Sequence, residues 1–271
     1  MAEIRLEGLG KLYGGRQGQA MAMIAQGAAK AEILARSGCN LALYGIDMTL
    51  RDGEITVLMG LSGSGKSTLL RCLIRLIEPS FGAIRFNGAD ITGFTQPELR
   101  QFRRQSVSMV FQNFALLPHK TVLDNAAFGL VLKGVKRREA EASGAEWLER
   151  LGLKGYERAL PATLSGGMRQ RVGLARALAC DPDVLLMDEA FSALDPLIRA
   201  ELQDQLLGLQ RELGKTVVFV THDIQEALRL GNRIAVMRDG RLEQFAEPAE
   251  LTENPASEYV ARFVGQAELA R

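Results

Sequence analysis

Short apolar runs alternate with helical patterns along most of this chain. Runs with the length and β-branched content of buried strands stand at residues 55–60, 107–111, 183–188, 216–220 and 233–237. Between them, apolar side chains recur every three or four residues, as in helices. Because parallel strands need crossover connections, this alternation predicts a mostly parallel sheet with helices on both faces.

Two segments depart from this alternation. Residues 3–9 and 46–50 alternate apolar and polar side chains, as half-buried strands do. Residues 20–36 between them are rich in helix formers and predict one short surface helix. Its apolar stripe would be formed by Ile24, Ala28, Ala31 and Ala35.

The second departure is the stretch 113–165, which has a helical pattern throughout, clearest at 121–133 and 137–151. It predicts a helical lobe inserted into the α/β core. Later in the chain, Asp239-Gly240 predicts the turn of a β-hairpin.

Composition excludes several classes of function. The chain carries 33 Lys and Arg against 32 Asp and Glu, a balance that does not favour a nucleic-acid partner. No window has the roughly 18 apolar residues of a membrane helix, and the N-terminus is no secretory signal. We expect a soluble chain that contacts a membrane through a partner. Cys39, Cys72 and Cys180 lack metal-ligand spacing and are expected to be buried thiols in a reducing cytoplasm.

A glycine-rich loop follows the run at 55–60. It fits the pattern G-x-x-x-x-G-K-[ST] and leads into a helical pattern from Lys66 to Ile77. Glycines let backbone N–H groups point at phosphate oxygens, Lys66 would reach the β- and γ-phosphates, and the Ser67 hydroxyl would ligate Mg²⁺. The residues expected to bind ATP here are Gly60, Leu61, Ser62, Gly63, Ser64, Gly65, Lys66, Ser67 and Thr68.

Two consecutive carboxylates stand where the run at 183–188 ends. Asp188 would lie beside the magnesium ion, and Glu189 is the candidate general base for the water that attacks the γ-phosphate. Taken alone, these residues could also be an acidic helix cap after a strand. Combined with the phosphate loop, they indicate a phosphate-loop NTPase.

A second anion site is predicted where another helical run begins. Ser165 can cap this helix, while Gly166 and Gly167 leave N–H groups exposed at its start. One chain thus has two phosphate-binding helix starts.

Here the chain resembles the ATPases of the ABC family, whose signature reads LSGGQ. Residues 164–170 read LSGGMRQ, with Met168 at the position of the signature Gln. The resemblance implies that the signature of one copy closes over the ATP held by a second copy, in a head-to-tail dimer. Ser165, Gly166 and Gly167 would contact that ATP.

The resemblance implies functions for four more residues. Tyr13 would stack on adenine, and Asp195 would cross the dimer interface. Gln112 would contact the attacking water or the metal and report γ-phosphate to the helical lobe. His222 would hold Glu189 and the water in line. Alone, Tyr13 is more often a core aromatic and His222 a strand-end histidine.

The resemblance also implies the fold: a phosphate-loop NTPase core of ABC ATPase type with an antiparallel β subdomain and a helical subdomain. We expect one nucleotide-binding domain over 1–271, with the α/β core at about 1–112 and 166–271, the helical subdomain at about 113–165 and a helical insert at about 14–42.

Within the ABC family, the chain is most similar to the ATPases of importers for glycine betaine, proline betaine and choline. The resemblance is carried by the insert and by the segments around the phosphate loop, Gln112, the signature and Glu189. It implies two kinds of partner: an integral membrane permease, and a substrate-binding protein that this chain contacts only indirectly. It also implies a peripheral location on the cytoplasmic face of the bacterial plasma membrane. The regulatory CBS modules that often follow this cassette are not expected here.

Alternatives stay open. The same motor could import histidine, another amino acid or trimethylamine N-oxide. In another class, a non-transport ABC ATPase would act on ribosomes or DNA, although such proteins typically carry two cassettes or a long coiled-coil insertion. A regulatory or inactive cassette is the third alternative, but every catalytic position is filled.

Overall fold

The computed structural model describes residues 2–269, with side chains through residue 265. Contacts group the chain into two units. The first holds Asp52–Val57 and Thr95–Thr221 together with Ala2, and the second holds Glu3–Arg51, Leu58–Phe94 and the chain from His222 onward. The division falls within strand β3 (Ile55–Met59), whose two ends therefore belong to different units.

The first unit is built on parallel strands. β6 (Val107–Val110) pairs with β7 (Val184–Asp188), and β7 pairs with β8 (Thr216–Thr221), both in parallel register. The first residues of β3 continue this sheet beside β8, where the Val217 N–H donates to the Glu54 carbonyl at 3.0 Å. Every residue of β7 and β8 is buried, as the continuous apolar runs predicted.

Helices follow the strands of the first unit as predicted, but the segment 113–165 is not helical throughout. Residues 113–121 and 151–160 form turns and loops. Gly152 and Gly155, with φ of 75° and 91°, interrupt the helical pattern. The helices are α4 (Gln96–Gln105), α5 (Val122–Leu132), α6 (Arg137–Arg150), the 3-10 turn η2 (Pro161–Thr163), α7 (Gly166–Leu178) and α8 (Pro196–Leu213).

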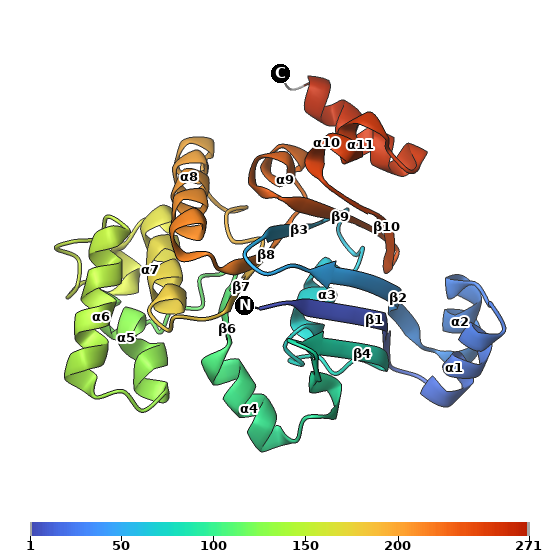
Figure 1. The fold of residues 1–271 in the computed structure, drawn as a ribbon, viewed down its shortest axis with the longest axis horizontal. Coiled ribbons are helices and arrows are strands. Elements are labelled where there is room, and N and C mark those ends of the chain that lie inside the picture. The colour runs from blue at the N-terminus through green and yellow to red at the C-terminus, as the bar shows by residue number, and fades with distance from the viewer. Residues whose placement is uncertain (1, 270–271) are drawn as a thin grey trace. The chain divides into compact units, whose positions relative to one another are not determined.

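The second unit contains an antiparallel sheet of order β2-β1-β4-β5. Figure 1 shows its first three strands, β2, β1 and β4, side by side. The predicted alternation at 3–9 and 46–50 lies in β1 and β2, and its apolar members are buried. The strands are β1 (Ile4–Tyr13), β2 (Asn40–Leu50), β4 (Phe81–Phe86) and β5 (Ala89–Asp90).

A hairpin lies beside the last residues of β3 in the second unit. It consists of β9 (Arg233–Arg238) and β10 (Arg241–Ala246). The turn residues Asp239 and Gly240 have φ of 51° and 82°, as a type I′ turn requires, so the predicted hairpin is confirmed. The unit also contains α3 (Lys66–Cys72), η1 (Ile91–Gly93), α9 (Ile224–Leu230), α10 (Pro248–Glu253) and α11 (Glu258–Leu269).

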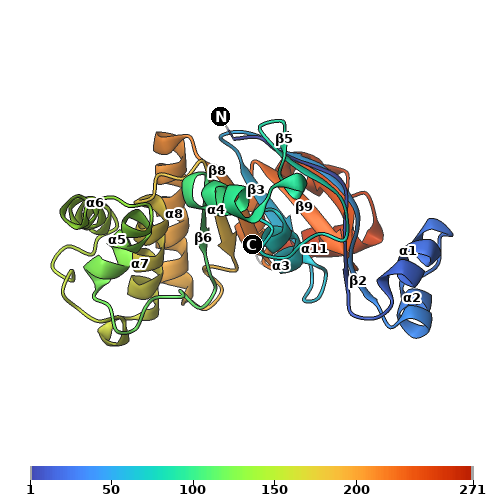
Figure 2. The same ribbon diagram turned by 90° about the horizontal axis from the view of Figure 1, so that it is seen from below.

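The insert after β1 forms two helices rather than one. α1 (Gln17–Ala25) and α2 (Lys30–Ser37) are separated by Gly27, whose φ is 76°. The expected stripe was wrong in its second half, because the turn breaks the helical period: Ile24 and Ala28 are half-buried against the core of the insert, whereas Ala31 and Ala35 are exposed. Figures 1 and 2 show both helices beside the ends of β1 and β2. The residues buried there are Leu12, Ala20, Met23, Ile33, Cys39 and Leu41.

The three cysteines are free thiols, and two of them are buried as expected. Cys39 and Cys72 are buried, and Cys180 is half-buried. Burial raises the pKa of the Cys72 thiol to about 12, so this group stays protonated and unreactive at neutral pH.

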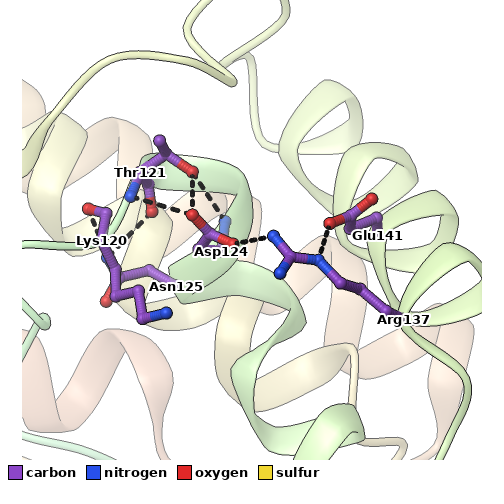
Figure 3. A network of polar contacts seen from close by, with 6 residues as sticks. All are labelled: Lys120, Thr121, Asp124, Asn125, Arg137 and Glu141. Carbon is purple, nitrogen blue, oxygen red and sulfur yellow. Dashed lines mark hydrogen bonds and ion pairs between the residues drawn. The ribbon is translucent and has the colours of Figure 1, made fainter.

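A polar network joins the starts of α5 and α6 (Figure 3). The Thr121 hydroxyl accepts from the Asp124 N–H at 3.1 Å, and the Asp124 carboxylate accepts from the Thr121 N–H at 3.4 Å, which together form a capping box on α5. The same carboxylate also accepts from the Thr121 hydroxyl at 2.8 Å. Arg137 at the start of α6 donates to Asp124 at 3.0 Å and to Glu141 at 2.6 Å. The hydrogen bond from Thr121 is the main cause that lowers the pKa of Asp124.

We predict that Thr121→Ala will lower the free energy of unfolding by about 1 kcal/mol at neutral pH. Thr121→Ser, which keeps the hydroxyl, should lower it much less. The pKa of Asp124 is lower in the folded chain, so this stabilisation is present above the unfolded pKa and is lost as the pH falls. The penalty should therefore shrink below about pH 4. Urea unfolding across this range measures it, and an equal penalty at all pH values would contradict the assignment.

Candidate functional site

The phosphate loop lies between the end of β3 and the start of α3. Its shape depends on glycines at two close approaches. A Cβ atom on Gly60 would lie 2.3 Å from the Met237 carbonyl oxygen, and one on Gly65 would lie 2.8 Å from the Ala42 carbonyl oxygen. Both residues also have positive φ, 151° and 103°. Only glycine therefore permits this path of the backbone.

Lys66 folds back over the loop that precedes it. Its ammonium group donates to the carbonyl oxygens of Gly60 at 2.8 Å and Leu61 at 3.1 Å, and the residue is 5% exposed. The Ser64 carbonyl in the same loop accepts from the Gly240 N–H at 3.0 Å. The loop thus holds a positive charge at its centre and is fixed to the β9–β10 turn within the second unit.

The helix after this loop is shorter than its apolar pattern predicted. α3 ends at Cys72 instead of Ile77, because Arg75 adopts a left-handed φ of 50°. The Arg75 guanidinium donates to the carbonyls of Ile91 and Phe94, both at 2.8 Å. These contacts from later in the chain fix the turn.

The two carboxylates at the end of β7 have different backbone settings. Asp188 is the last residue of the strand and is 6% exposed. Glu189 is half-buried and has a left-handed φ of 45°, a conformation that costs a non-glycine residue about 1–2 kcal/mol. Its N–H donates to the Val220 carbonyl of β8 at 3.2 Å. The chain thus leaves the sheet sharply between the two acidic residues.

Gln112 and Glu189 are linked through Ser192 within the first unit. The Gln112 side-chain amide donates to the Ser192 hydroxyl at 3.4 Å, and that hydroxyl donates to the Glu189 carbonyl at 2.9 Å. The sequence analysis assigned no function to Ser192. The link became visible only from the structure, since 80 residues separate Gln112 and Ser192.

The segment after Gln112 is held in an unusual conformation. Phe114 and Ala115 are consecutive left-handed residues, with φ of 58° and 46°. The Arg176 guanidinium of α7 donates to both of their carbonyls, at 3.0 and 2.7 Å. Arg169 lies over the Phe114 ring at 5.3 Å. Helix α7 therefore fixes the backbone that follows Gln112.

The start of α7 has the predicted cap. The Ser165 hydroxyl accepts from the Met168 N–H at 3.3 Å, and α7 begins at Gly166. Gly167 has a second role that sequence reasoning missed, since a Cβ there would lie 2.6 Å from Cγ2 of Ile198 in α8. Asp195 caps α8 by accepting from the Ile198 N–H at 3.0 Å. The starts of α7 and α8 thus pack directly together.

Comparisons with known proteins identify the family of this chain. The ABC transporter family model matches residues 43–192. The glycine betaine transport ATP-binding protein OpuAA of Bacillus subtilis is 51% identical over 99% of this chain and 64% of its own length. The glycine betaine/proline betaine transport system ATP-binding protein ProV of Escherichia coli is 48% identical over 99% of this chain and 67% of its length.

This chain belongs to the ABC transporter family. Its fold is that of ABC ATPases: a solved dimeric structure of the ATP-binding cassette MJ0796 bound to ADP and Pi matches with a TM-score of 0.77 and 31% identity, over 90% of this chain and 98% of that one. The trimethylamine N-oxide transport system ATP-binding protein TmoW of Pelagibacter ubique is 47% identical over 96% of this chain and 76% of its length.

Two further predicted residues of this ABC ATPase lie at the ends of strands. Tyr13 is the last residue of β1, is 38% exposed and has the Lys11 ammonium 4.9 Å from its ring centroid. His222 is exposed and follows β8. Tyr259 of α11 was not predicted, although its hydroxyl accepts from the Leu61 N–H at 3.5 Å. No helix in the described part of the chain has both the length and the apolar composition to cross a bilayer.

We predict that Glu189→Gly will be more stable than Glu189→Ala by about 1 kcal/mol, because only glycine adopts the left-handed backbone without strain. Both changes remove the same carboxylate, so the comparison isolates the backbone. Urea unfolding measures the difference. Ala190→Gly is the control and should destabilise the chain, since Ala190 is buried and has no positive φ. Equal stability of the two Glu189 variants would count against the strain.

Proposed function

We propose that this chain is the ATP-hydrolysing motor subunit of a binding-protein-dependent ABC importer for quaternary amines such as glycine betaine. The observation that carries the proposal is the phosphate loop closed around the Lys66 ammonium, on the same chain as a capped Ser-Gly-Gly helix start. The first of these binds phosphate and the second is the ABC signature.

The residues of the loop fit a nucleoside triphosphate. Lys66 would exchange its bonds to the Gly60 and Leu61 carbonyls for bonds to phosphate oxygens, which attract the ammonium more strongly. Backbone N–H groups from Leu61 to Thr68 would bind the remaining oxygens. Tyr13, with an exposed ring at the end of β1, would stack on the adenine.

Mg²⁺ fits the donor set that the resemblance implies. Ser67, Gln112 and Asp188 offer a hydroxyl, an amide and a carboxylate, all oxygen ligands of the kind that Mg²⁺ prefers. The described residues contain no cluster of three His, Cys, Asp or Glu side chains, which suits a metal held mainly by phosphates and water. When bound, Mg²⁺ would neutralise charge on the phosphates.

Glu189 would accept a proton from the attacking water, and His222 would hold that water in line. The link from Gln112 through Ser192 to the Glu189 backbone gives Gln112 a path to the base. If Gln112 moves when the γ-phosphate is bound or lost, the movement would therefore shift the Glu189 backbone and the segment that Arg176 holds.

The active form would be a head-to-tail dimer of this chain. Ser165, Gly166 and Gly167 of one copy would contact the ATP on the phosphate loop of the other, and Asp195 would lie at the interface. The solved structures of MJ0796 are described as dimeric, which supports this assembly. Closure on ATP and reopening on hydrolysis would drive an integral membrane permease.

The cargo is proposed from the relatives, most of whose length this chain spans. Three of them are named for glycine betaine transport. Recognition would be by a substrate-binding protein and the permease, with this chain peripheral on the cytoplasmic face of the plasma membrane. Trimethylamine N-oxide is the second candidate cargo, because two relatives named for its transport are 47% and 50% identical.

We predict that Lys66→Ala will weaken ATP binding at least about tenfold, since the charge at the centre of the loop is lost. Binding of a fluorescent ATP analogue measures the change. Lys154→Ala, which removes an exposed lysine from a loop of the first unit, is the control and should bind normally. Unchanged affinity in Lys66→Ala would remove this loop from the nucleotide site.

We predict that Glu189→Gln will lower the rate of ATP hydrolysis at least about a hundredfold. ATP would stay bound, so an ATP-bound dimer should accumulate. Size-exclusion chromatography with and without ATP, together with phosphate release, measures both effects. Wild-type hydrolysis in this variant would falsify the base assignment. A monomer that hydrolyses ATP at the wild-type rate would contradict the dimer.

A further inference from the structure

A basic cleft lies in the first unit, and of its charged residues only Arg176 has a part in the mechanism above. It lies among α4, β6 and the C-terminal ends of α5 and α7, and it has a volume of about 210 Å³. A second hollow of about 520 Å³ lies beside this cleft and is lined mainly by residues of α4. Arg104 and Lys133 line both hollows. The cationic residues that line the two hollows are Arg100, Arg103, Arg104, Lys133 and Arg176.

None of the residues that line the two hollows is acidic. The Lys133 ammonium donates to the Cys180 carbonyl at 2.5 Å, and the Arg176 guanidinium donates to the carbonyls of Phe114 and Ala115. Carbonyl oxygens satisfy hydrogen bonds but do not neutralise a positive charge. Burial also lowers the pKa of Arg176, because it removes water from the charged guanidinium.

We propose that this cleft binds a phosphate-bearing anion. The guanidinium groups of Arg104 and Arg176 have forked donors of the geometry that phosphate oxygens match. The two hollows share Arg104 and Lys133, so an anion with more than one phosphate group would have cationic donors on both sides of this pair. No aromatic side chain lines either hollow, so nothing in the cleft would stack on a nucleobase. The chemistry therefore favours a polyphosphate or a phospholipid headgroup over a nucleotide.

An anion in this cleft would act on the segment after Gln112. Arg176 both lines the cleft and holds the left-handed residues Phe114 and Ala115. A phosphate oxygen on its guanidinium would compete with these two carbonyls for the same donors. An effect of this competition on ATP turnover rests on the proposed function, whereas binding of the anion to the cleft does not.

The binding test uses tripolyphosphate and the full chain. Lys66→Ala serves as the background, so that the phosphate loop does not compete. Isothermal titration calorimetry should find one tripolyphosphate per chain. Adding Arg104→Gln and Lys133→Gln should weaken binding at least about tenfold, since two charged donors are lost. The matched control adds Lys136→Gln and Arg138→Gln, which remove the same charge from exposed positions at the start of α6.

The control should bind as tightly as the background. Equal weakening in both sets would overturn the proposal, because it would show only a dependence on net charge. Arg104→Gln alone, at an exposed position, replaces the double variant if circular dichroism shows that the latter is unfolded. Absence of tripolyphosphate binding in the background would overturn a free polyphosphate as the source.

The second arm uses vesicles of phosphatidylcholine with and without phosphatidylglycerol. Co-sedimentation that requires phosphatidylglycerol and is lost in the Arg104→Gln, Lys133→Gln variant identifies a lipid headgroup as the source. Binding in neither arm would overturn the proposed site. Binding of poly-glutamate, a polyanion that carries no phosphate, would also overturn it. Because no arm measures ATP hydrolysis, a failure here is distinct from a failure of the motor function.

Discussion

The shape of the phosphate loop is set by contacts between backbones. A methyl group on Gly60 or Gly65 would collide with a carbonyl oxygen from another strand, so the loop follows the only path those strands leave open. The Lys66 ammonium then fills the space inside with a positive charge bonded to the loop carbonyls. The positive charge is therefore already inside the loop, and in the proposed function the ammonium would exchange its bonds to these carbonyls for bonds to phosphate oxygens.

The first unit stores strain where it carries predicted chemistry. Glu189, Phe114 and Ala115 all have left-handed backbones, and none is glycine. Each is held from outside: Glu189 by the carbonyl of Val220, and the other two by the Arg176 guanidinium. Such conformations persist only when the surroundings over-determine them, and they are typical of positions that change state during function.

Features that depend on local pattern could be predicted from the sequence. The parallel strands, the Asp239-Gly240 turn and the cap at Ser165 each rest on a few neighbouring residues, and the structure has all of them. Errors arose where a pattern was continued through a residue that breaks it. The insert was counted as one helix through Gly27, and α3 was extended past Arg75, whose turn is fixed by carbonyls much later in the chain.

Gly167 shows why a motif can be predicted while its physical basis is only half known. The sequence explains this glycine by an exposed N–H at a helix start, which any small residue would also offer. In the structure, a Cβ atom there would collide with Ile198, so the glycine also permits α7 and α8 to begin side by side. Asp195, which caps α8 through the Ile198 N–H, is fixed by the same contact. The proposed interface residues at the starts of α7 and α8 are therefore positioned as one group, and a side chain added at Gly167 would displace Asp195 as well as the signature.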